Sequence, residues 1–139
     1  MLTRVLIAAA LILLMPLAAL AEETKVLALG LTDHAVTEAE LGDGADLPQP
    51  HFNTPGVAYA LIADLKKGDM VEVALTKDGK ALMHNIREVE ADAPRVLLQA
   101  GKTGVLAGGW LGGTYTAMVT VTRDGKPILE DQSEAIPFD

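Results

Sequence analysis

The sequence has no cysteine, a single serine, Ser133, and few large aromatic residues among its 139 positions. Without cysteine, the chain cannot form disulfides, offer a thiol nucleophile or carry a lipid on a cysteine. With one serine and no Gly-x-Ser-x-Gly motif, it also lacks the nucleophile elbow of serine hydrolases. We therefore expect no enzymatic activity, and a core filled mainly by aliphatic side chains.

Positive charge is also scarce. The formal net charge is −8, and no Lys or Arg occurs between Lys25 and Lys66. An acidic protein without a basic patch is not expected to bind nucleic acid. The acidic balance instead predicts a soluble domain after the N-terminal residues have been removed.

The longest apolar run lies at the N-terminus. Arg4 precedes the apolar residues 5–17, and residues 19–21, Ala-Leu-Ala, have the small-x-small form that signal peptidase cleaves. This pattern predicts a signal peptide over residues 1–21 and a periplasmic or secreted protein with no stable membrane insertion after cleavage. An uncleaved N-terminal membrane anchor is the alternative, although the run is short for a bilayer span of about 20 residues.

Residues 22–139 are expected to form one domain of short strands, because polar and apolar residues alternate between turn signals. No segment keeps a helical period for three turns, although residues 37–40, Thr-Glu-Ala-Glu, could cap a single turn. The fold predicted is an all-β, immunoglobulin- or fibronectin-like antiparallel sandwich of about seven strands. The strands are expected at residues 25–31, 56–65, 69–77, 80–86, 94–100, 114–123 and 126–136.

Two Asp-Gly turns and two aromatic residues add detail to this prediction. Gly79 and Gly125 would supply the positive φ of tight hairpins. Tyr115 follows a Gly-Gly corner, so it is either a tyrosine corner bonded to the backbone just upstream or an ordinary cross-strand aromatic. Trp110 is expected to plug one end of the core, with an exposed binding patch as the alternative.

Residues 32–55 are too long for an ordinary connection and carry five acidic residues and three prolines. Acidic loops of this kind are usually solvated, and the Asp43–Asp46 spacing lacks the ladder of a calcium loop. We expect a long, acidic and partly mobile excursion at one edge of the sandwich.

Metal binding is the main chemical alternative. Soft and imidazole ligands suit copper in an oxidising compartment, but the histidines lack the spacings of established metal motifs. Ordinary strand packing explains the same residues, so no metal and no cofactor are predicted. The candidate ligands are His51, His84, Met70 and Met83.

Several motifs carry a family resemblance. They are residues 65–71 (Leu-Lys-Lys-Gly-Asp-Met-Val), residues 78–79 (Asp-Gly), residues 109–115 (Gly-Trp-Leu-Gly-Gly-Thr-Tyr) and residues 122–126 (Thr-Arg-Asp-Gly-Lys). Residues 52–136 resemble the immunoglobulin-like accessory domain that follows the catalytic domain in some Gram-negative lysostaphin-type zinc peptidases. The zinc ligands of those peptidases have no counterpart here, so the resemblance implies a binding role without hydrolysis.

These observations predict a non-catalytic periplasmic binding or accessory module that recognises an envelope protein or a cell-wall component. The alternative is a periplasmic carrier of copper or of another small ligand.

Overall fold

The computed structural model describes residues 23–42, 47–102 and 109–138. The predicted signal peptide and the acidic pair Asp43 and Asp46 lie outside the described residues. The elements of the described residues are β1 (Lys25–Thr32), α2 (Glu38–Gly42), β2 (Gly56–Leu65), β3 (Met70–Lys77), β4 (Lys80–Glu88), β5 (Ala93–Lys102), β6 (Gly113–Arg123), β7 (Lys126–Gln132) and β8 (Ile136–Phe138).

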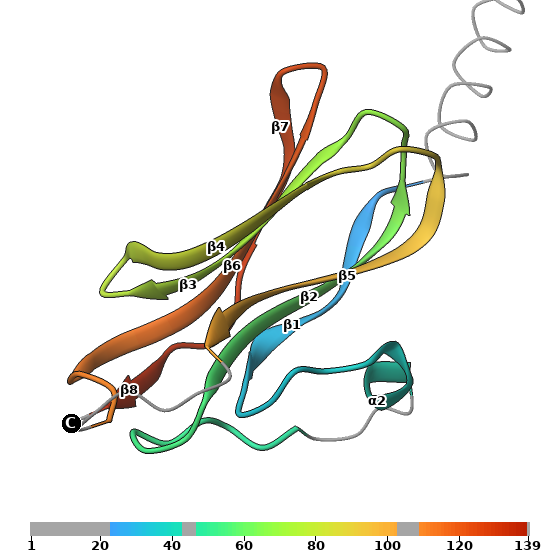
Figure 1. The fold of residues 1–139 in the computed structure, drawn as a ribbon. Helices are drawn as coiled ribbons and strands as arrows, with labels where there is room; N and C mark the ends of the chain where they lie inside the picture. Colours follow the sequence, from blue (N-terminus) through green and yellow to red (C-terminus); the bar gives the residue numbers. More distant parts are fainter. Residues whose placement is uncertain (1–22, 43–46, 103–108, 139) are drawn as a thin grey trace, which may run out of the picture.

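These strands form two antiparallel sheets that pack face to face (Figure 1). The order is β1-β2-β5 in the first sheet and β4-β3-β6-β7 in the second, with β8 also paired to β6. The predicted fold class, an all-β antiparallel sandwich, is therefore confirmed. The core between the sheets is mainly aliphatic, and alternation along β3 and β6 places every second side chain in it. The buried members of these two strands on the core side are Val71, Val73, Leu75, Tyr115, Ala117, Val119 and Val121.

The central strand β2 does not alternate, because both of its faces are covered. Ala60 and Ile62 belong to the core, whereas Val57 and Leu61 face the other way and are still only 3% exposed each. A strand buried on both faces has a nearly continuous apolar sequence, as residues 57–63 do. The first sheet therefore needs a cover on its outer side.

Residues 32–42 are bound to that outer side. The Gln99 side chain of β5 accepts a hydrogen bond from the Val36 amide (2.7 Å) and donates one to the Val36 carbonyl (2.9 Å). The expected helical turn is present as α2, where Thr37 and Glu40 each accept a hydrogen bond from the other's backbone amide. The excursion predicted as a loop thus begins as a segment fixed to β5.

The strand predicted over residues 126–136 is wrong in its second half. The chain leaves the ladder after Gln132 and returns as β8 at Ile136. Ser133 fills the gap, because its hydroxyl accepts a hydrogen bond from the Ala117 amide (2.9 Å) and its own amide donates to the Ala117 carbonyl (2.9 Å). The side chain of the only serine replaces a backbone group, so the edge bulges between β7 and β8.

Both Asp-Gly hairpins have the conformation expected from the sequence. The φ angles are 51° and 85° at Asp78 and Gly79, and 52° and 77° at Asp124 and Gly125. Two successive residues with positive φ match the twist of antiparallel strands in a two-residue turn.

Replacing Gly125 with valine should therefore weaken the β6–β7 hairpin by about 1–3 kcal/mol, since a β-branched residue resists positive φ. A Cβ atom at this position would have no atom of a non-neighbouring residue within 4 Å, so the expected loss comes from backbone strain and not from a clash of the Cβ. Thermal unfolding measures the effect, and Gly125→Asn is the control because asparagine tolerates this conformation. Equal melting temperatures for Gly125→Val and the wild type would contradict the turn geometry.

Candidate functional site

The end of the sandwich near the C-terminus is built around Trp110 and Tyr115. Trp110 is buried, and its indole nitrogen donates a hydrogen bond to the Thr54 carbonyl (2.6 Å). Its ring meets Tyr115 edge-on, with 5.8 Å between the ring centroids. The Tyr115 hydroxyl donates to the Leu111 carbonyl (2.7 Å), and burial raises the pKa of this phenol. Trp110 thus plugs the core, and Tyr115 has the contact of a tyrosine corner.

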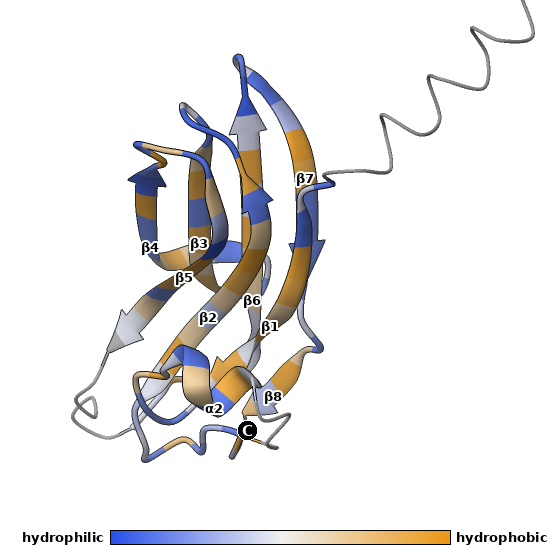
Figure 2. Cartoon of the chain, turned by 90° about the vertical axis from the view of Figure 1, so that its right-hand side faces the viewer, coloured by the Kyte–Doolittle hydropathy of each residue, from blue (hydrophilic) through white to orange (hydrophobic). Residues whose placement is uncertain are grey.

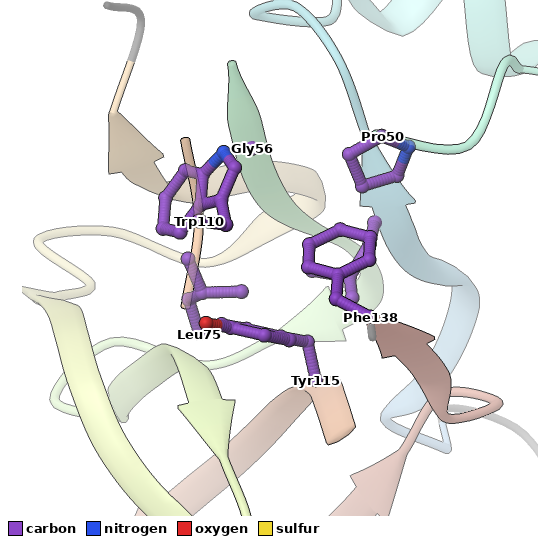
Figure 3. Close-up of a pocket in the computed structure, with 7 residues that line it drawn as sticks. Pro50, Gly56, Leu75, Trp110, Tyr115 and Phe138 are labelled. Atoms are coloured by element: carbon purple, nitrogen blue, oxygen red, sulfur yellow. The ribbon is translucent and has the colours of Figure 1, made fainter. Parts of the chain in front are cut away.

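These side chains surround a small apolar pocket (Figure 3). Pro50 and Phe138 close it opposite Trp110, with 4.9 Å between the ring centroids of Tyr115 and Phe138. Its volume is about 10 Å³ and its lining is apolar, so it has room for about one water molecule and no polar partner for it. The pocket is a packing feature, and its value to function is that it fixes the surface above it.

That surface carries two exposed apolar side chains, Phe52 and Leu111, which are 56% and 71% exposed. Both belong to backbone that the core holds in place. The Phe52 carbonyl accepts a hydrogen bond from the Trp110 amide (2.6 Å), and the Leu111 carbonyl accepts the Tyr115 hydroxyl. Hydrogen bonds from the Trp110 amide and the Tyr115 hydroxyl thus fix the backbone that presents both apolar side chains to solvent.

Two adjoining hollows lie between this surface and the free edge of β1. The first, of about 350 Å³, is lined by residues 29–31 of β1 together with Tyr59, Glu134 and Ile136. The second, of about 510 Å³, is lined by residues 49–52 and 136–138. Both hollows include Gln49 and Ile136, so we treat them as one feature, the β1–β8 groove.

The groove exists because the two sheets are not joined on this side. In the described residues β1 pairs only with β2, and β7 and β8 pair only with β6, although β1 and β7 are neighbours in space (Figure 2). On the opposite side the Asn85 side chain of β4 donates a hydrogen bond to the Gln99 carbonyl of β5 (3.0 Å), which links the two sheets there. That side has a hollow of its own, of about 460 Å³, but its lining, residues 87–93 and Val96, includes the basic side chain of Arg87.

The backbone near the groove is not suited to pairing with an added strand. In β8, Pro137 lies opposite Thr114, whose amide donates to the Asp78 side chain (3.0 Å) and whose carbonyl accepts the Asp78 amide (2.8 Å). The Pro137 backbone must then face away from β6, and proline offers no N–H to a further strand. On β1, the register shift between Val26 and Ala28 interrupts the edge just before residues 29–31, the part that lines the groove. Recognition in the groove would depend mainly on side chains.

The electrostatics of the groove are one-sided. None of the described residues that line it is Lys or Arg, and Glu134 is exposed on one wall. This follows from the sequence, because the walls come from residues 26–65 and 127–139, which contain acidic residues but no Lys or Arg. The lining of the groove thus mixes polar and apolar groups, and among the described residues it contains the carboxylate of Glu134 but no basic Lys or Arg side chain.

His34, Asp33 and Glu40 form a charged cluster in the segment fixed to β5. In His34, Nδ1 lies 2.8 Å from an Asp33 carboxylate oxygen and Nε2 lies 2.6 Å from one of Glu40. A neutral imidazole has one N–H, so hydrogen bonds from both nitrogens require the protonated ring. The bonds to Asp33 and then to Glu40 raise the pKa of His34, and the bond from His34 lowers the pKa of Glu40.

This cluster predicts a pH dependence with a definite sign. Because the pKa of His34 is raised on folding, its contribution to stability is complete below its ordinary pKa of 6.5 and disappears as the pH rises through the raised value. An NMR titration of the His34 ring should give a midpoint above 6.5, and Glu40→Gln should lower it. Glu38→Gln, on the same helical turn, is the control. A midpoint unaffected by Glu40→Gln would contradict the pairing.

The candidate copper ligands do not converge. Met83 and His84 are consecutive residues of β4, so their side chains point to opposite faces, and Met83 packs against the core. The His84 imidazole lies 3.0 Å from the Glu72 carboxylate. Met70 lies four residues along β3 from Ala74, the partner of His84, a distance of about 13 Å in a strand. His51 lines the β1–β8 groove on another part of the molecule.

Sequence reasoning missed the groove and the roles of Ser133, Gln99 and Phe52 in shaping this side of the molecule. The sequence contains one signal of the groove: residues 26–65 and 127–139, which supply its walls, both lack Lys and Arg. The other contributions depend on which strands meet in space, and no local pattern shows that.

In the described part of the chain no helix is both long and apolar enough to cross a membrane. Comparisons with protein-family models, with curated proteins and with solved structures found no match to this chain.

Proposed function

We propose that this protein is an exported, immunoglobulin-like module that binds an envelope protein or a cell-wall component without catalysing a reaction. The N-terminal residues support export, since they have the charge, the apolar run and the small-x-small site of a signal peptide. The strand order and the Tyr115 hydroxyl bond support the immunoglobulin-like class.

One observation carries the binding role. The strongly exposed Phe52 side chain lines the β1–β8 groove, and its carbonyl accepts a hydrogen bond from the amide of Trp110, the residue before Leu111, which is also strongly exposed and whose carbonyl accepts the Tyr115 hydroxyl. A cleft of several hundred Å³ with fixed apolar groups at its rim has the size and character of a binding site. A rigid surface also loses little conformational entropy on association.

Site-specific photo-crosslinking in the native host tests this role. A photoreactive phenylalanine analogue placed at Phe52 or Leu111 should give the same discrete adduct, which mass spectrometry identifies as an envelope protein or a peptidoglycan fragment. The control position is Ile86 of β4, which is 50% exposed but far from the groove along the sheet order. No adduct, or the same adduct from Ile86, would contradict a binding surface at the groove.

A further inference from the structure

We propose that the β1–β8 groove binds an extended cationic segment of a partner polypeptide, in which Lys or Arg alternates with apolar residues. This inference rests on the proposed binding function and adds the chemistry of the partner. Its support comes from the shape of the groove, the apolar side chains in its mixed lining and the absence of Lys and Arg from that lining.

The shape favours an extended chain. The two hollows of the groove share Gln49 and Ile136, so together they form one continuous depression. The β1 edge at residues 29–31 lines the first hollow and residues 49–52 line the second, while residues 133–138 face both. An extended chain advances about 3.3 Å per residue, with alternate side chains on opposite sides. Such a chain can place one set of side chains in the groove and the other set at its rim.

Part of the mixed lining fits apolar side chains of a partner. Leu29 and Leu31 lie on one wall, Ile136 and Phe138 on the other, and Phe52 at the open end. Burying an aliphatic side chain of a partner here removes apolar surface from water on both molecules, at roughly 25 cal/mol per Å². Aromatic and proline surfaces also present flat contacts that need no further ordering.

The charge selects the sign of the partner. The sequence segments that build both walls, residues 26–65 and 127–139, have no Lys or Arg, and Glu134 is exposed on the rim. A cleft that offers a carboxylate and no Lys or Arg attracts cationic groups and disfavours anionic ones. The same field disfavours anionic lipid surfaces, which attract basic proteins. A polypeptide with spaced cationic residues satisfies both the charge and the apolar lining.

Calorimetric binding to synthetic octapeptides tests this proposal. A peptide that alternates Lys and Leu should bind one molecule of the protein. Its affinity should fall at least fivefold when salt rises from about 0.05 to 0.5 M, because screening weakens exposed charge pairs. A Glu–Leu peptide of the same length should bind at least tenfold more weakly.

Two pairs of variants locate the site. Glu134→Lys should weaken the Lys–Leu peptide about tenfold, whereas Glu88→Lys, with the same change in net charge on the far edge strand β4, should change it less than twofold. Phe52→Ala should also weaken binding about tenfold, with Ile86→Ala as its control. Both control side chains are exposed, and melting temperatures confirm that all four variants fold.

Several results would overturn the proposal: no binding of the Lys–Leu peptide, equal binding of the Glu–Leu peptide, or equal losses in the Glu134→Lys and Glu88→Lys proteins. Octalysine provides a further comparison. If it binds as tightly as the Lys–Leu peptide and is unaffected by Phe52→Ala, then the interaction is only electrostatic and the apolar groove has no part in it. The crosslinking experiment separates this inference from the function on which it rests. Adducts at Phe52 without peptide binding would reject the cationic partner alone.

Discussion

Replacing Trp110 with alanine should lower the free energy of unfolding by about 3–5 kcal/mol, as is typical when a buried aromatic side chain is removed from a core. Trp110 is only 5% exposed, and no smaller side chain can fill its place between Gly56 and Tyr115. A side chain at Gly56 would approach the indole ring to 3.0 Å, so the backbone of β2 is fitted to this ring. The loss of the indole also leaves the Thr54 carbonyl without its donor.

Denaturant unfolding measures this effect, and Leu111→Ala is the matched control because the two residues are adjacent. The Leu111 side chain is exposed and its carbonyl bond to Tyr115 does not depend on the side chain. We expect the control to stay within about 0.5 kcal/mol of the wild type. If Trp110→Ala is no more harmful than Leu111→Ala, then the ring does not plug the core.

The second large effect concerns Asp69, whose side chain is 1% exposed. Its carboxylate accepts two hydrogen bonds from the Arg123 guanidinium (2.8 Å each) and one from the Lys66 amide (2.8 Å). Arg123 also donates to the Thr24 hydroxyl (2.9 Å), so one ion pair ties the β2–β3 turn to the ends of β6 and β1. Asp69→Asn should cost about 2–4 kcal/mol, since the change removes one partner of a largely buried pair.

The ion pair also predicts how the stability of the protein depends on pH. The bonds from Arg123, together with that from the Lys66 amide, lower the pKa of Asp69. A carboxyl whose pKa is lowered on folding stabilises the protein at any pH above its unfolded value, and this contribution is lost as the pH falls through the folded value. The wild type should therefore lose part of its stability advantage over Asp69→Asn below about pH 4. Glu90→Gln, a substitution of an exposed carboxyl, serves as the control. If the difference in unfolding free energy between the wild type and Asp69→Asn does not vary with pH, the ion pair is contradicted.

Local sequence patterns were enough to predict much of the fold. The alternation of polar and apolar residues along 114–123 and 69–77 predicts which side chains enter the core, because a strand buried on one face has apolar residues at every second position. The Asp-Gly pairs record turn geometry, since few residues tolerate successive positive φ angles. For Tyr115 the sequence left two roles open, a tyrosine corner or a cross-strand aromatic, and the structure shows a hydrogen bond from its hydroxyl to a carbonyl only four residues upstream.

What the sequence did not show depends on contacts between distant segments. Asp69 was predicted to begin a strand after a turn. Its ion pair was not predicted, because its partner Arg123 lies 54 residues further on. Ser133 was predicted to lie within a continuous strand. Only the hydrogen bond from the Ala117 amide shows that its hydroxyl interrupts the ladder. The continuous apolar run of β2 was predicted only as a strand, and the contact that covers its outer face depends on Val36, which is held by Gln99, 63 residues away.

The groove is the clearest case of this limit. It is formed by the edges of β1 and β8, which lie at opposite ends of the described chain, and by residues 47–52 between them. Each of these segments has an ordinary explanation when taken alone. Their shared lack of Lys and Arg becomes informative only when the structure places them around one depression.

Hydrogen exchange of the complex with the crosslinked partner tests the central claim most directly. If the β1–β8 groove is the binding surface, then backbone amides of residues 29–31 and 49–52, together with those of residues 133–138, should exchange more slowly in the complex than in the free protein. The amides of β4 should be unchanged. Protection confined to β4, or none in the three groove segments, would contradict the account.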